Sequence, residues 1–205
     1  MSEVHPVVFA EITVPWEPDF SDMWMKEFYE KWLTVPYSQE KEEYQNHPEN
    51  FGSSLIGIDE QEFDFLNENL EQPINKEEFL SGKTCIIYRN GLDLSNSDLI
   101  GSKVTCALHS DKQVTQTFTI GGVTDESYYT AILGYPPTII TSDQVVKNFA
   151  NESITLKIGV KYTKEYDRNI EKEILKLLEA NVNAKDFSWD SKIEKADEIK
   201  NAQGY

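Results

Sequence analysis

The segment 101–123 constrains the fold more than any other stretch of the sequence. Apolar and polar residues alternate over 104–108 and again over 115–120, on both sides of the polar stretch 109–112. Alternation with a period of two around a polar turn predicts a β-hairpin of two antiparallel strands with one buried face. Gly121-Gly122 follows, and we expect the chain to bend there, because glycine adopts positive φ at little steric cost.

The two ends of the chain carry the same order of elements. Residues 7–14 and 53–58 are rich in β-forming residues and predict two strands, with apolar residues at helical spacing between them. Residues 154–162 and 187–193 predict two more strands around a helix over 163–180. We expect these two β-α-β units to pair into one four-stranded sheet with two helices on one face, a split, ferredoxin-like α+β lobe.

The middle of the chain is richer in strands, and it separates the two β-α-β units. Local patterns predict two strands, at 84–88 and 138–141. They also predict three helices: one over 60–70, one over 76–80 with Asn75 as its N-cap and Gly82 as its stop, and one that begins at Ser142 or Asp143. We therefore divide the chain into a split α+β lobe, residues 1–81 and 148–205, and an inserted β-rich lobe, residues 82–147. Both termini then leave the same lobe, and we expect them to lie close together.

The charge of the chain narrows the class of partner. The 205 residues include 19 Lys and Arg against 36 Asp and Glu, which gives a formal net charge of −17. A surface this acidic disfavours nucleic acid and anionic lipid head groups, because both are bound through clustered Lys and Arg. No apolar run approaches the ~20 residues that span a bilayer, and the first residues lack the basic start and apolar centre of a signal peptide.

The sequence holds no recognisable catalytic or metal-binding pattern. His5, His47 and His109 are scattered, without metal-ligand spacing, and there is no nucleophile motif or phosphate-binding glycine loop. Cys85 and Cys106 lie in predicted strands with no CxxC pattern, so we expect two packed free thiols, or a disulfide in an oxidising compartment. We expect a protein that is not an enzyme and that binds no metal or cofactor.

Several short motifs follow one another in a fixed order. They read LIGID at 55–59, TCIIY at 84–88, LIGSKV at 99–104, FTIGGV at 118–123, PTII at 137–140 and SKIEKADEIK at 191–200. In their order and spacing they resemble the extracytoplasmic (periplasmic) core domain of ABC transporter permeases of the MacB/FtsX-like type. The resemblance covers most of residues 53–205, and the final motif resembles the segment that runs into the second transmembrane helix of such permeases.

The resemblance implies a mechanical role at the extracytoplasmic face of the cell membrane. A porter-like α+β lobe carries an inserted β-rich lobe, and neither holds catalytic residues. The implied partners are the permease's own transmembrane helices, a cytoplasmic ABC ATPase, and a second permease copy in a homodimer. ATP hydrolysis in the cytoplasm would then drive export, release or sensing of a peptide, lipoprotein or other protein outside the cell.

The hairpin 101–123 is the expected spine of the inserted lobe, held away from the membrane. We expect partner contact at its tip, through Asp111 and Lys112, and at the loop that carries Tyr128 and Tyr129. The alternative left open by the sequence is a free-standing secreted or surface-anchored ligand-binding module. In that reading the aromatic stripe of the first helix would border a pocket, with Trp24, Phe28 and Trp32 as its members.

Overall fold

The computed structural model describes residues 3–17, 21, 36–88, 99–125, 137–151 and 154–161, and a few residues between 169 and 176. Ser2–Lys161 forms one compact unit, and Tyr162–Tyr205 with Met1 belongs to a second. The described residues of the first unit hold seven strands.

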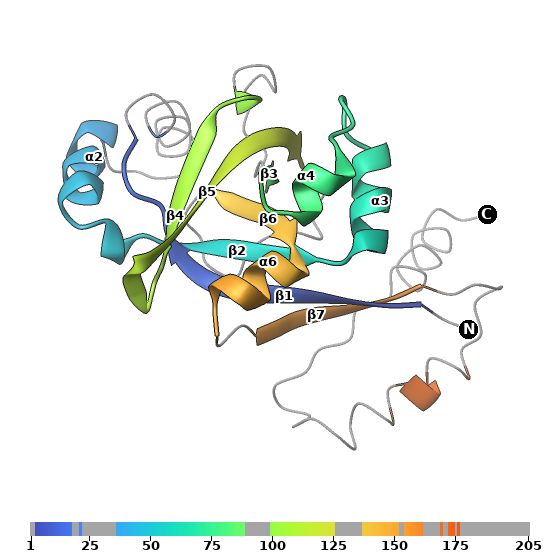
Figure 1. Cartoon of the computed structure of the whole chain (residues 1–205). Coiled ribbons are helices and arrows are strands. Elements are labelled where there is room, and N and C mark those ends of the chain that lie inside the picture. The colour runs from blue at the N-terminus through green and yellow to red at the C-terminus, as the bar shows by residue number, and fades with distance from the viewer. Residues whose placement is uncertain are drawn as a thin grey trace, which may run out of the picture. The chain divides into compact units, whose positions relative to one another are not determined.

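One mixed sheet runs through this unit (Figure 1). Its strands are β1 (Glu3–Thr13), β2 (Gly52–Ile58), β3 (Thr84–Tyr88), β4 (Lys103–Leu108), β5 (Asp111–Thr124), β6 (Thr138–Ser142) and β7 (Ile154–Lys161). The strand order is β2-β6-β3-β5-β4-β1-β7, and β1 also pairs with β2. That additional pairing closes six of the strands into a ring, with β7 attached to the outside of β1.

The strand directions are mixed around the ring. The pairs β1–β2, β1–β4, β1–β7, β3–β6 and β4–β5 are antiparallel, while β2–β6 and β3–β5 are parallel. β1 and β4 meet at two residue pairs, Ile12↔Leu108 and Thr13↔Ala107. The β2–β6 pair is longer, with four residue pairs from Leu55↔Ile139 to Ile58↔Ser142.

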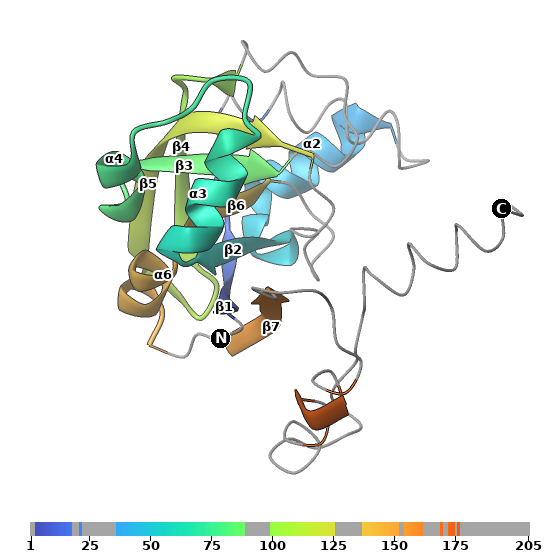
Figure 2. The ribbon, with the colours of Figure 1, turned by 90° about the vertical axis from the view of Figure 1, so that its right-hand side faces the viewer.

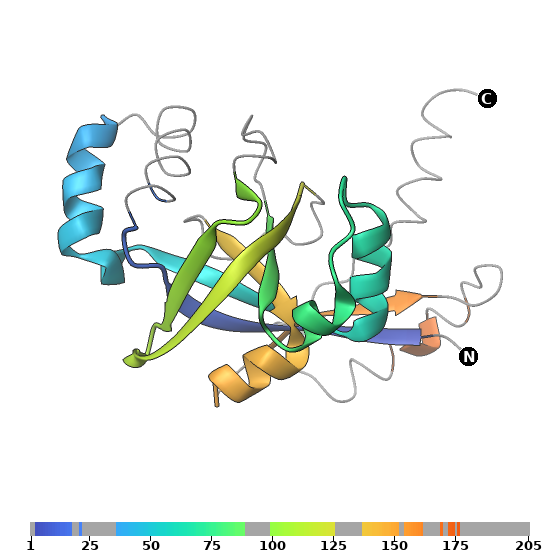
Figure 3. The same ribbon diagram turned by 45° about the horizontal axis from the view of Figure 1, so that its top comes forward.

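The helices cover the ring from different sides (Figures 2 and 3). They are α2 (Tyr37–Asn46), the short 3-10 helix η1 (Pro48–Asn50), α3 (Glu60–Glu68), α4 (Lys76–Leu80) and α6 (Asp143–Phe149). α3 and α4 lie side by side, and α2 lies away from them, beyond the other end of the sheet (Figures 1 and 3). The predicted caps of the short helices are present: Asn75 Oδ1 accepts a hydrogen bond from the Glu78 N–H at 3.0 Å, and Ser142 Oγ accepts one from the Gln144 N–H at 3.3 Å.

The sheet is buried on both faces over its central strands. In β3, Cys85 and Ile87 point into the ring. There, buried apolar side chains from all six strands of the ring pack with one another and with Tyr44 of α2. Ile86 and Tyr88 point outward and pack beneath Phe63 of α3 and its neighbours. A strand that is buried on both faces has no solvent-facing side, which explains why β3 reads TCIIY, a nearly continuous apolar run, rather than an alternating one.

The elements predicted within the described residues are confirmed, with two corrections at their ends. β1 begins earlier than predicted, at Glu3, and runs through Pro6. Pro6 lies opposite Ile158 of β7, before the pairing with β2 begins at Val8, so its missing N–H removes no bond to β2.

The second correction concerns Gly121-Gly122, where a bend was expected. β5 runs through both residues to Thr124, and neither has a positive φ. Gly121 is instead the extra residue of a β-bulge opposite β3, which shifts the alternation so that Ile120 and Val123 both face the inside of the ring. A Cβ at Gly122 would lie 2.7 Å from Leu70 Cδ1, so close packing, not a turn, favours glycine here.

The two expected lobes share this one sheet. β1 pairs with both β2 and β7, so strands from the two ends of the chain share the sheet, and β3–β6 complete the ring. β1 and β2 are direct antiparallel neighbours, which corrects the expected β-α-β unit, whose two strands would be parallel. The predicted helix with Trp24, Phe28 and Trp32, most of the helix predicted over 163–180, and the strand predicted at 187–193 lie outside the described residues, as does the C-terminus. The lobe boundaries and the proximity of the termini therefore stay predictions.

Candidate functional site

The tip of the β4–β5 hairpin is where the sequence analysis places partner contact. His109 and Ser110 form the turn, and β5 begins at Asp111. Asp111 and Lys112 are both exposed, as expected. Asp111 Oδ1 accepts a hydrogen bond from the Gln113 N–H at 3.0 Å, and Lys112 Nζ donates one to Thr13 Oγ1 at 3.2 Å.

These contacts attach the tip to the end of β1. The His109 N–H adds a hydrogen bond to the Glu11 carbonyl at 3.0 Å, next to the β1–β4 pairing. Tyr128 and Tyr129 lie outside the described residues. Partner contact at all four positions stays a prediction.

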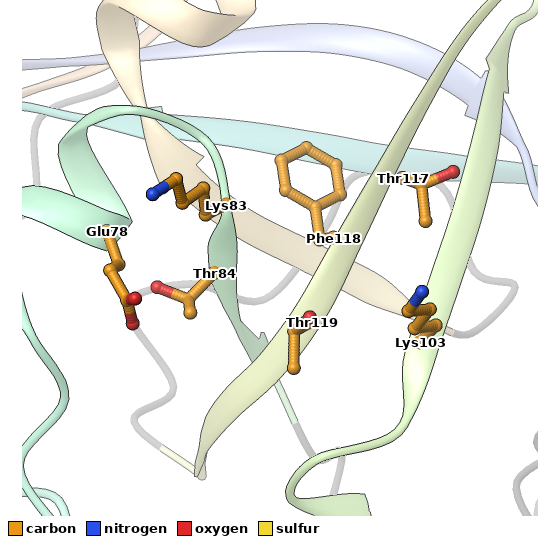
Figure 4. Close-up of a pocket in the computed structure, with 7 residues that line it drawn as sticks. All are labelled: Glu78, Lys83, Thr84, Lys103, Thr117, Phe118 and Thr119. Carbon is orange, nitrogen blue, oxygen red and sulfur yellow. The ribbon is translucent and has the colours of Figure 1, made fainter.

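A hollow of about 480 Å³ opens on the outer face of the hairpin's other end, beside α4 (Figure 4). Lys103 lines it from the β4 side, and Lys83 and Glu78 line it from the β3 and α4 side. The remaining lining residues are Thr84, Thr117, Phe118 and Thr119. The hollow is open to solvent, and its walls are mainly polar side chains.

The end of α4 positions the Lys83 side of the hollow. The Gly82 N–H donates to the Phe79 carbonyl at 3.0 Å, and the Lys83 N–H donates to the Glu78 carbonyl at 2.9 Å. This Schellman pattern needs a left-handed residue, and Gly82 has φ +74°. The chain then enters β3 directly, which places Lys83 and Glu78 beside each other at the rim.

A second glycine turn positions the Lys103 side. Gly101 has φ +89°, and its N–H donates to the Ile120 carbonyl at 2.8 Å. β4 then begins with Lys103 opposite Thr119, and Thr119 lies opposite Thr84 of β3. Lys103, Thr119 and Thr84 therefore form one row across three neighbouring strands.

The hollow brings together groups that the sequence analysis did not connect. Lys83, Lys103 and Glu78 are exposed, and in the described part of the chain none of their charged groups has an ion-pair partner within 4.0 Å. Thr84 is 9% exposed, and its Oγ1 is covered and has no hydrogen-bond partner among the described residues. The alternation of Thr115, Thr117 and Thr119 was the available signal, but it indicates only a shared face and not which strands lie beside it.

Other titratable groups lie inside the ring. Cys85 and Cys106 are free, buried thiols, so the expectation of packed free thiols is confirmed. Burial raises the pKa of the Cys106 thiol to about 12 and that of Cys85 well above its ordinary value. Burial also raises the pKa of Tyr44, whose hydroxyl donates to the Val14 carbonyl. Groups that hold their protons this firmly are poor nucleophiles at neutral pH.

These thiols predict a loss of stability in alkali. The ordinary thiol pKa is 9.0 here, so above that pH the unfolded chain releases protons that the folded chain retains. The free energy of unfolding should therefore fall from pH about 9 upward, by about 1.4 kcal/mol per pH unit for each thiol, until the folded pKa is reached. Urea unfolding at pH about 8 and about 10 measures this. A Cys106→Ala variant should show a shallower fall, and an identical fall in both proteins would contradict the prediction.

Within the described ranges, no three or more His, Cys, Asp or Glu side chains are grouped so as to hold a metal ion. Among the same residues, no helix is both long enough and apolar enough to cross a membrane.

No protein-family model matches the sequence, and no curated protein matches it either. Among solved structures, the chain is similar to domains of bacterial transporters. The periplasmic region of MacB from Actinobacillus actinomycetemcomitans matches with a TM-score of 0.47 and 16% identity, over 97% of this chain and 76% of that one. The extracellular domain of the ABC-type transporter YknZ from Gram-positive bacteria matches with a TM-score of 0.44 and 14% identity, over 87% of this chain and 75% of that one.

Proposed function

We propose that the chain is the extracytoplasmic domain of an ABC transporter permease of the MacB/FtsX-like type. One observation carries the proposal: the five motifs between residues 55 and 140 fall on β2, β3, β4, β5 and β6. These are five consecutive strands of the sheet, in the order β2-β6-β3-β5-β4. Motifs that are scattered along the sequence thus belong to one continuous piece of structure, as expected when a whole domain is shared.

The individual motif residues support the same reading, because each meets a specific requirement of the fold. Gly57 lies where a Cβ would be 2.7 Å from the Asp143 Cα. Asp59 caps α3, accepting a hydrogen bond from the Glu62 N–H at 2.8 Å. Gly101 supplies the positive φ before β4. The motifs therefore describe the geometry of a sheet and its turns, and no catalytic group is proposed among them.

The proposed partners follow from the membrane setting. The domain would be connected to the permease's own transmembrane helices at the extracytoplasmic face, in a homodimer that works with a cytoplasmic ABC ATPase. ATP hydrolysis would change the shape of the domain, which would move, release or sense a peptide or protein outside the cell. The net charge of −17 favours a cationic peptide as that partner, because opposite charges speed encounter.

Such a change of shape requires a junction at which the two proposed lobes can move relative to each other. In the proposed division, residues 1–81 with 148–205 form the porter-like lobe and residues 82–147 form the inserted lobe. The lobes then meet at the β2–β6 pair and at the two residue pairs of β1–β4. Because β1–β4 has two residue pairs against four in β2–β6, we place the movement there, where the His109–Glu11 and Lys112–Thr13 hydrogen bonds would break as well.

Labelling in intact cells tests the proposed location. A cysteine introduced at the exposed Glu68 of α3, in the natural protein that carries this chain, should react with a membrane-impermeant maleimide added outside the cell. Cys85 and Cys106 are buried and should stay unlabelled, so the natural protein is its own background control. Labelling that occurs only in permeabilised cells would place the domain inside the cell and contradict the proposal.

Charge reversal at the hairpin tip tests the proposed contact. Exchanging the charges, with Asp111→Lys and Lys112→Glu together, leaves the net charge unchanged. We expect transport or sensing by the intact transporter to fall roughly tenfold, the effect of about 1.4 kcal/mol lost at an interface. The isolated chain should keep its stability within about 1 kcal/mol, since only the Lys112–Thr13 bond is lost from β1.

A control variant distinguishes a specific effect at the hairpin tip from the effect of changing any surface charge. Glu68→Lys changes an exposed charge on α3, away from the hairpin, and should leave transport unchanged. If the tip exchange left function intact, the partner site would have to lie elsewhere on the domain.

A further inference from the structure

The hollow beside α4 has the chemistry of a site for a small anion. We propose that it binds an oxyanion, and that it binds phosphate more tightly than carboxylate. The site is independent of the membrane role proposed above and lies at the opposite end of the hairpin from the tip.

The charges around the hollow favour an anion. Lys83, just before β3, and Lys103, at the start of β4, line it from opposite sides, against the single carboxylate of Glu78 (Figure 4). Neither lysine has an ion-pair partner among the described residues, so both charges are available to an anion although the net charge of the chain is −17. A net positive rim attracts anions and repels metal cations, and two ammonium groups match a phosphate dianion better than a single carboxylate charge.

The floor of the hollow supplies hydroxyl groups. Thr84, Thr117 and Thr119 line it, and hydroxyls donate hydrogen bonds to oxyanions. Thr84 is the informative one, because its Oγ1 is buried in a residue that is only 9% exposed and yet has no partner among the described residues. Ser54, His109 and Thr141 also hold a buried polar atom without a partner among the described residues, but of these four residues Thr84 alone lines the hollow. A change of its rotamer would let the hydroxyl donate to a bound anion.

The fold holds these groups in place from both sides. Gly82 and the end of α4 fix the backbone of Lys83, and the Thr119 N–H donates to the Lys83 carbonyl at 2.9 Å. Gly101 fixes the start of β4, and Lys103 pairs with Thr119. Only the ends of the lysine side chains and the rotamer of Thr84 need to adjust to close around an anion.

NMR titration of the whole chain with inorganic phosphate, and separately with acetate, tests the site. Phosphate should produce saturable shifts at the amides of Thr84, Lys103 and Thr119, with acetate weaker at the same residues. Lys83→Gln and Lys103→Gln should each weaken phosphate binding roughly tenfold, the effect of one charge-assisted hydrogen bond. Sodium chloride should weaken binding as well, because exposed charges are screened by salt.

Two further variants distinguish specific phosphate binding in the hollow from non-specific attraction of phosphate to surface lysines. Lys112→Gln removes an exposed lysine of the same hairpin outside the hollow and should leave the phosphate affinity unchanged. Thr84→Val keeps the shape, removes the unused hydroxyl and should weaken binding while the chain stays folded. Shifts spread evenly over all lysines, or an affinity that is the same in Lys83→Gln, Lys103→Gln and the natural chain, would overturn the proposal.

Discussion

Replacing Gly57 with alanine should destabilise the chain by about 3 kcal/mol, at the upper end of what overpacking a core costs. The added Cβ would lie 2.5 Å from Val8 Cγ2, 2.7 Å from Asp143 Cα and 2.8 Å from Val146 Cγ2. One of these atoms belongs to the backbone at the start of α6, so the clash can be relieved only if α6 moves away from β2. Urea unfolding of the two proteins measures the difference.

The matched control for Gly57 is Gly122→Ala. There the added Cβ meets Leu70 Cδ1 at 2.7 Å, which is the end of a side chain that can change rotamer. We expect a loss of about 1 kcal/mol, clearly smaller than at Gly57. Equal losses at the two positions, or a larger loss at Gly122, would mean that α6 does not hold its place on β2 as described.

Replacing Phe63 with alanine should cost about 3–5 kcal/mol, which is typical of a buried aromatic residue lost from a core. Phe63 is fully buried between α3 and the outer face of the sheet, and its ring stacks on that of Phe79 at a centroid distance of 4.3 Å. Its removal leaves a cavity between α3 and α4, which cannot collapse because both helices are joined to strands by their caps. Thermal or urea unfolding provides the measurement.

Phe65 provides the control on the same helix. It is 50% exposed, two positions away from Phe63, and it lies outside both core clusters. Phe65→Ala should change the free energy of unfolding by about 0.5 kcal/mol or less. A large loss at Phe65 would indicate that α3 presents a different face to the sheet.

Local sequence patterns predicted the elements of this chain well, because those patterns arise from neighbouring residues. Asn75 and Gly82 marked the two ends of α4, since a cap and a left-handed stop are decided within a few residues. The alternation over 104–108 and 115–120 predicted the β4–β5 hairpin for the same reason. The bulge at Gly121 was missed because it depends on β3 and on the side chains of Leu70 and Ile74, which are distant in sequence.

The pairing of the strands and the hollow could not be predicted in this way. Nothing in the sequence of β2 indicates that its neighbours are β1 and β6 rather than β3, since an apolar strand can pair equally well with several others. The row of Lys103, Thr119 and Thr84 exists only because β5 lies between β4 and β3. The hydroxyl and lysine groups of the hollow were visible in the sequence, but their meeting depends on that strand order.

The position of β1 has a consequence for how the chain folds as it is made. β1 precedes all of its partners along the chain; these are β2, β4 and β7, and β7 ends at Lys161. Pairings between such distant residues make folding slow, because a long loop must close before each contact is gained. Until β7 arrives, Glu3–Val7 has no strand beside it in the described sheet, since β2 pairs only from Val8 onward. The nascent domain therefore keeps an unpaired β edge until β7 has been made, and a factor that shields such edges during synthesis or export would raise the yield of folded protein.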